Sequence, residues 1–75
     1  MKYAVIIEHA GSNYSAYSPD VPGCIAAAKT VEETLRLFKE AMEFHFESLI
    51  QYGEPIPQPT TACEYVEPQI PIPAA

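Results

Sequence analysis

The residues with side chains suited to catalysis or metal binding are two histidines, two cysteines and ten carboxylic acids. His9 directly follows Glu8, and adjacent side chains of a strand point to opposite faces, so these two cannot easily act together. His45 has no second metal ligand at helical spacing. The positions three and four residues away from it are Ala41, Met42, Ser48 and Leu49. We predict no catalytic residue and no metal site, and interpret both histidines as structural, with a pH-sensitive or interface role for His45 as the alternative.

Cys24 and Cys63 are far apart in the sequence and form no Cys-x-x-Cys pair. The chain also begins without the basic flank and apolar run of a signal peptide, and this indicates the cytoplasm as its location. Thiols stay reduced in that compartment, so we expect two reduced, buried cysteines. The sequence has 3 glycines and no glycine-rich phosphate loop, and we predict no cofactor.

One alternative that involves chemistry rests on three carboxylic acids, Glu8, Asp20 and Glu64. They would support a weak metal-dependent nuclease activity if they met around one cation. Such catalysis needs carboxylates close enough to share the metal ion, so their positions in the structure test this alternative.

The charge of the chain is acidic, with a formal net charge of -6 from 10 acidic and 4 basic residues. The basic residues, Lys2, Lys29, Arg36 and Lys39, form no cluster in the sequence. Because binding to a phosphate backbone needs clustered Lys and Arg, we expect no direct contact with nucleic acid. An acidic surface would favour a basic partner, although acidity more often serves only solubility. No apolar run is long enough to cross a membrane, and we expect no membrane contact.

Four short segments have the composition or the flanking turns of strands. They span residues 3–8, 14–18, 24–29 and 62–67. Turn residues at 10–13 join the first two segments as an antiparallel hairpin. Pro22 and Gly23 form a defined corner before the third, because proline fixes φ at the first central position of a turn and glycine accepts the positive φ at the second.

The clearest element of the sequence is one long helix. Thr30 and Glu33 match a capping box, which marks the start of the helix. At the other end Gly53 can take the left-handed cap position, and Pro55 forbids continuation. The sequence therefore predicts a helix over residues 31–52.

The apolar residues of this helix form one stripe that we expect to face the sheet. The stripe consists of Val31, Leu35, Phe38, Met42, His45, Phe46 and Leu49. Leu37, Ala41 and Phe44 lie beside it and widen the apolar arc to roughly 200°, more than one sheet face can cover. We predict that these three residues form an oligomer or partner interface. The alternative is that Leu37 and Phe44 are two tolerated hydrophobic residues of the surface.

These elements predict an α+β domain of order β-β-β-α-β, in which a small antiparallel sheet packs on one long helix. The domain spans residues 1–67, and residues 68–75 form a Pro-rich C-terminal tail. A chain of 75 residues has room for only a thin core, so we expect a homo-oligomer, either a dimer or a tetramer.

Several segments, taken in order, resemble the HicB family of antitoxin-like domains. They are MKYAVIIE, YSPDVPGC, TVEETLRLFKEAME and LIQYGEPIPQP, and together they cover most of the chain. The resemblance implies a fold likened to a partial ribonuclease H domain without its active site. It also implies no enzymatic activity.

The family resemblance implies a protein partner as well. Members typically bind a HicA-type toxin, a small basic ribonuclease that cleaves mRNA, and block its active surface. Many members append a helix-turn-helix or ribbon-helix-helix segment that binds operator DNA, whereas this chain ends in PQIPIPAA. We therefore expect an antitoxin-like binding module without DNA contact, or alternatively an orphan oligomeric domain that has no toxin.

Overall fold

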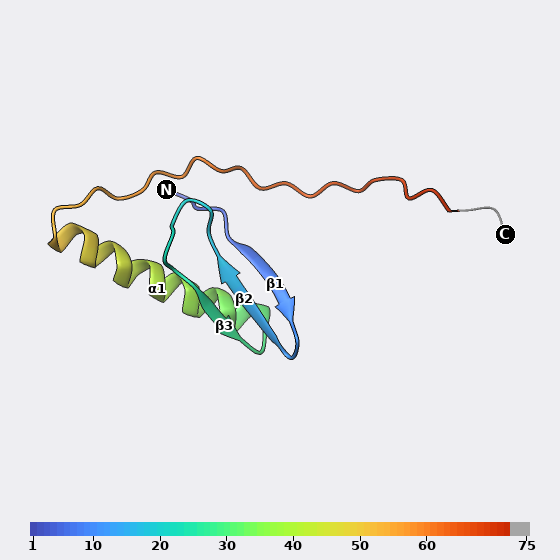
Figure 1. Ribbon diagram of the computed structural model, residues 1–75, viewed down its shortest axis with the longest axis horizontal. Helices are drawn as coiled ribbons and strands as arrows, with labels where there is room; N and C mark the ends of the chain where they lie inside the picture. Colours follow the sequence, from blue (N-terminus) through green and yellow to red (C-terminus); the bar gives the residue numbers. More distant parts are fainter. Residues whose placement is uncertain (73–75) are drawn as a thin grey trace.

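The computed structural model describes residues 1–72. Strands β1 (Ile6–Ala10), β2 (Asn13–Tyr17) and β3 (Ala26–Ala28) form an antiparallel sheet in the order β1-β2-β3. Helix α1 (Val31–Gln51) follows and lies across one face of the sheet (Figure 1). The predicted α+β architecture of a small antiparallel sheet on one long helix is confirmed.

The β1–β2 hairpin sets the register of the sheet. Ala10 pairs with Asn13, and Gly11 between them takes a φ of 61°, as the first central position of a two-residue hairpin turn requires. At the other end the last pair is Ile6 with Tyr17. The chain turns away after Tyr17, so residues 3–5 have no partner strand. The predicted first strand, 3–8, is therefore displaced to Ile6–Ala10.

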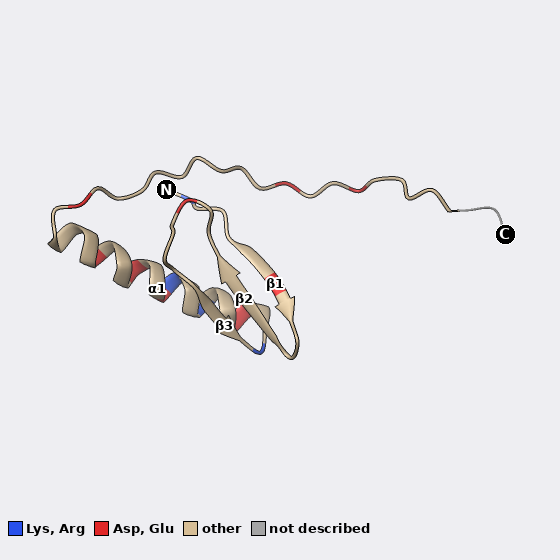
Figure 2. Cartoon of the chain, in the orientation of Figure 1, with Lys and Arg blue, Asp and Glu red and all other residues tan. Residues whose placement is uncertain are grey.

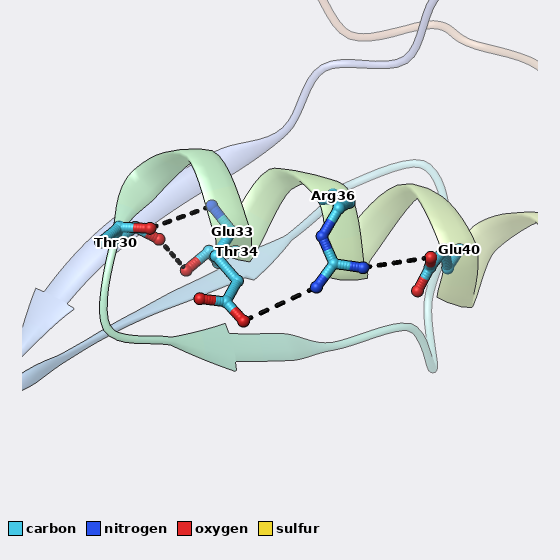
Figure 3. A network of polar contacts seen from close by, with 5 residues as sticks. All are labelled: Thr30, Glu33, Thr34, Arg36 and Glu40. Atoms are coloured by element: carbon cyan, nitrogen blue, oxygen red, sulfur yellow. Dashed lines mark hydrogen bonds and ion pairs between the residues drawn. The ribbon is translucent and has the colours of Figure 1, made fainter.

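Helix α1 begins at the predicted cap. The Thr30 hydroxyl accepts a hydrogen bond of 3.1 Å from the Glu33 amide (Figure 3). The Glu33 carboxylate lies 3.6 Å from the Arg36 guanidinium, which also contacts Glu40 at 3.3 Å. The first half of the capping box is thus present, while the Glu33 side chain pairs along the helix instead of with the Thr30 amide.

The helix ends in a Schellman motif. Gly53 takes a φ of 69°, and its amide donates to the Ile50 carbonyl at 3.1 Å. The Glu54 amide donates to the Leu49 carbonyl at 2.8 Å. These two bonds satisfy carbonyls that the end of a helix leaves without partners, so the chain turns sharply after Tyr52.

The core between sheet and helix is small. Its buried apolar residues are Ala16, Val21, Cys24 and Phe38. Partly buried residues packed against them are Tyr3, Val5, Ile7, Ala26, Met42 and Phe46. Thr34 is also fully buried, and its hydroxyl donates to the Thr30 carbonyl at 2.7 Å, so this buried polar group is satisfied.

The predicted core stripe is only partly covered. Phe38 is buried, but Val31 and Leu35 each remain 42% exposed. Helix α1 packs against β2 and β3. Val31 and Leu35 instead line an open hollow next to Val5 and Ile7, so neither side chain is fully covered there. The prediction that the whole stripe faces the sheet is wrong at these two positions.

After the helix the chain runs back over the domain and is held at two points. The Tyr3 hydroxyl donates to the Pro57 carbonyl at 2.7 Å. Asp20 accepts four hydrogen bonds from Thr60 and Thr61, two from their amides at 3.0 and 2.9 Å and two from their hydroxyls at 2.8 and 3.0 Å. We call this contact the Asp20 clamp. Beyond it the chain continues away from the sheet (Figure 1).

The predicted fourth strand at residues 62–67 is not present. In the described chain, residues 62–72 are extended and exposed, and they belong to no strand. A strand needs a neighbouring strand to pair with its amides and carbonyls, and this segment leaves the sheet after the Asp20 clamp. The predicted tail, 68–75, is likewise extended as far as residue 72, and its last three positions lie outside the described residues.

No helix found within residues 1–72 combines the length and the hydropathy that a membrane crossing requires.

Removing the N-cap should destabilise the domain. Thr30→Ala deletes the acceptor of the Glu33 amide, and such substitutions lower the free energy of unfolding by about 1 kcal/mol. Thr30→Ser keeps a hydroxyl and serves as the matched control. Urea unfolding followed by circular dichroism measures both. Equal midpoints for Thr30→Ala and the unmodified chain would contradict the cap.

Removing the Asp20 clamp should release the tail without unfolding the domain. Asp20→Ala deletes both acceptor oxygens, so amide hydrogen exchange at Thr60 and Thr61 should become faster while exchange in α1 stays unchanged. Glu64→Ala, which removes an exposed carboxylate from the tail, is the control and should leave both rates as they are. Unchanged exchange in Asp20→Ala would contradict the clamp.

The clamp should also depend on pH. Hydrogen bonds from the Thr61 amide, and next from the Thr60 side chain, lower the pKa of Asp20 from its usual 3.8. A carboxyl group whose pKa is lower in the folded state stabilises that state above its ordinary pKa and loses this effect as pH falls through the lowered value. Tail release, followed by the NMR amide shifts of Thr60 and Thr61, should therefore begin only below pH 3.8. Release that was already complete at higher pH would refute this assignment.

Candidate protein–protein interface

An open hollow lies between the corner after β2 and the middle of α1. Its floor and walls include Cys24, Ala41 and Ser48, and two large apolar side chains stand at its sides. These are Ile25, which is 73% exposed, and Phe44, which is 74% exposed. We call this surface the Phe44 patch. Exposed apolar side chains gathered around a hollow are typical of a protein contact.

Cys24 holds the corner against the helix beneath this patch. Its thiol lies 3.9 Å from the Ala41 carbonyl and is buried. Burial raises the pKa of the Cys24 thiol, which keeps it protonated and unreactive at neutral pH. Cys63 is also a free thiol, but it is exposed on the tail. The expectation of two buried cysteines is therefore wrong for Cys63, because the tail does not join the sheet.

The three residues predicted as an interface fall into two groups. Ala41 and Phe44 both line the hollow of the Phe44 patch, whereas Leu37 is half-buried and does not line it. Ile25 is a member that the sequence interpretation did not single out. A signal for it was available, because alternation in an extended segment turns Ile25 outward when Cys24 points into the core.

Acidic side chains border the Phe44 patch along the helix. Glu40 and Glu47 stand four residues before and three residues after Phe44, so they are its neighbours on the helix surface. Glu40 also contacts Arg36. Figure 2 shows that acidic residues recur along α1 and on the tail, while the basic residues lie in the first half of the helix, on the turn before it and beside the N-terminus of the chain. The patch thus combines an apolar centre with a negative border.

The two histidines lie at different places in the fold. His9 stacks on the Tyr14 ring across the β1–β2 hairpin, with ring centroids 4.6 Å apart. His45 is half-buried, lies 6.2 Å from the Phe46 ring, and contributes to the hollow beside Phe44. His45 therefore belongs to the candidate interface as well as to the edge of the core.

The carboxylates Glu8, Asp20 and Glu64, which the nuclease alternative would need, are not brought together. Asp20 binds the two threonines of the tail. Among residues 1–72 there is no group of three or more His, Cys, Asp or Glu side chains that could hold a metal ion. The arrangement therefore gives the nuclease alternative no support.

Comparisons with known proteins agree with the sequence resemblance. The family described as the HicB-like antitoxin of bacterial toxin–antitoxin systems matches residues 3–69. A chain of the solved HicA3 and HicB3 toxin–antitoxin complex has the same fold, with a TM-score of 0.68 and 30% sequence identity. The match covers 80% of this chain and 70% of that chain.

Several curated relatives are similar in sequence. An uncharacterised 14.9 kDa protein of Haemophilus phage HP1 is 35% identical over 66 residues, which is 88% of this chain but 50% of the phage protein. The chain thus spans half the length of that relative. A UPF0150 protein of Thermoplasma acidophilum is 41% identical over 59 residues, covering 77% of this chain and 86% of the relative. With the family match and the shared fold, these similarities establish that the chain belongs to the HicB-like antitoxins of bacterial toxin–antitoxin systems.

Proposed function

We propose that this chain neutralises a small basic toxin of the HicA type, which cleaves mRNA, by binding it and covering its active surface. The role is that of a non-catalytic binding module in the cytoplasm. The observation that carries the proposal is the Phe44 patch, an exposed apolar centre with an acidic border on a domain of net charge -6. The similarity of this chain to a chain of the HicA3 and HicB3 complex supports the same class of partner.

The charge and the apolar centre would contribute to different properties of the complex. Opposite charges on two partners raise the association rate and exclude wrong partners. A desolvated aromatic side chain at the centre of an interface slows dissociation and often supplies much of the affinity. Phe44 is exposed and has Ile25 beside it at the hollow, so it is placed for that role.

We further propose that the domain acts as a homo-oligomer, a dimer or a tetramer. A thin core and several exposed apolar side chains support this, because a chain this small gains stability from surface buried between copies.

The partner itself can be identified by co-purification. Expression of the gene with its neighbours should yield a complex with a small basic protein at low salt, and high salt should slow its formation because screening weakens the attraction between exposed charges. If no gene next to this one encodes a small basic protein, the proposal is wrong.

The Phe44 patch can be tested with two matched substitutions. Phe44→Ser should weaken toxin binding by about 2 kcal/mol, or roughly 30-fold, as expected for an aromatic residue at the centre of an interface. Ile50→Ser removes another exposed apolar side chain of α1 outside the patch and should leave affinity unchanged. Calorimetric titration measures both. Equal affinities of the Phe44→Ser variant and the unmodified chain would refute this surface as the contact.

A further inference from the structure

The charge of the chain is distributed unevenly along the sequence. Residues 1–39 contain all 4 Lys and Arg together with four acidic residues, so their charges balance. The net charge of -6 therefore comes from residues 40–75, which contain six acidic residues and no Lys or Arg. The last turn of α1 also has no basic residue, although the C-terminal end of a helix dipole favours a cation. The second half of the helix thus has a surplus of negative charge.

This surplus reaches the Phe44 patch through Glu47. Of the two acidic neighbours of Phe44, Glu40 contacts the Arg36 guanidinium at 3.3 Å, so its charge is partly balanced. Glu47 is exposed, and no Lys or Arg stands at helical spacing from it. The residues three and four positions away are Glu43, Phe44, Ile50 and Gln51. The apolar centre of the patch therefore borders a carboxylate without a basic neighbour on the helix.

The hollow of the patch sets two requirements for a side chain that fills it. Ile25 and Phe44 at its sides are apolar, and Ala41 between them is small, so an apolar part of the occupant can pack there. A purely apolar occupant would also take water away from the neighbouring Glu47 carboxylate and give it no new partner, which is costly. The occupant that fits therefore combines an apolar part with a positive charge.

An arginine side chain meets both requirements. Its planar guanidinium stacks on aromatic rings, is weakly hydrated and pairs with a carboxylate through two parallel N–H groups. Its aliphatic stem packs along apolar surface. A lysine ammonium is compact and strongly hydrated, so it can pair with Glu47 but gains less from the Phe44 ring. Glu47 is a neighbour of Phe44 on the helix surface, so one guanidinium can reach both.

We propose that the Phe44 patch binds an arginine side chain that the partner presents. The guanidinium stacks on the Phe44 ring and pairs with the Glu47 carboxylate, and the aliphatic stem packs against Ile25 and Ala41. This inference rests on the proposed function, because it takes the Phe44 patch as the partner contact. It adds the type of side chain that the partner inserts there.

The test uses the full chain and three short peptides as probes. Acetyl-Gly-Arg-Gly-amide is compared with the same peptide carrying lysine, or carrying citrulline, which has nearly the shape of arginine but no charge. NMR titration should show shifts of the Ile25, Phe44 and Glu47 amides. The arginine peptide should bind about 5-fold more tightly than either of the others. Absence of shifts at the patch, or equal binding of the lysine peptide, would overturn the proposal.

Two kinds of substitution test the roles of the ring and the carboxylate. Phe44→Leu keeps an apolar side chain but removes the ring, so the preference for arginine over lysine should disappear. Glu47→Gln should weaken binding of the arginine peptide about 3- to 5-fold. Glu43→Gln removes the same charge at a position about 100° around the helix from Phe44 and serves as the matched control. Equal losses in Glu43→Gln and Glu47→Gln would mean that only net charge matters, and the assignment of Glu47 would be wrong.

These titrations need no toxin, so their outcome is separate from that of the proposed function. If Phe44→Ser weakens toxin binding but the arginine peptide shows no preference, the patch is the toxin contact and the arginine inference is wrong. If the arginine peptide binds selectively while Phe44→Ser leaves toxin affinity unchanged, arginine recognition is supported and the toxin is not the partner of this surface.

Discussion

A sheet of three short strands has to cover one side of a 21-residue helix, and most features of the molecule depend on this mismatch. Neighbouring strands are about 4.8 Å apart, so three strands span only about 10 Å, close to the diameter of the helix itself. The helix is about 31 Å long, whereas a five-residue strand reaches about 17 Å. The sheet therefore leaves apolar helix surface uncovered at both flanks and toward the C-terminal end.

The irregular parts of the chain cover some of this surface. Val21 and Cys24, from the corner after β2, are buried against the helix. Tyr3 precedes β1 in the chain, and the centroid of its ring lies 5.4 Å from that of Phe46. What remains is a surface on each flank of the helix: the Phe44 patch on one side and, on the other, the hollow that Val31 and Leu35 line together with Val5 and Ile7.

Local rules predicted the elements that depend only on nearby residues. The helix begins after Thr30 and ends before Gly53 because a hydroxyl cap and a left-handed glycine act within one turn of the helix. The strands were less well predicted, since a strand exists only where another pairs with it. The first strand is displaced because β2 ends at Tyr17, and β3 is only three residues long because it pairs with residues 14–16 alone. The segment 62–67 has the composition of a strand but no neighbour.

The sequence by itself determined the helix with both its caps, the hairpin turn, the acidic charge and the family. It also placed Ala41 and Phe44 outside the core stripe, since the angular position of a residue on a helix follows from spacing alone. Only the tertiary structure decided that Ile25 stands beside Phe44, that Asp20 holds the tail, and that Val31 and Leu35 lack cover. The physical reason is that these features depend on the width of the sheet and on the path by which the chain returns to the sheet after the helix. No local pattern of residues encodes that width or that path.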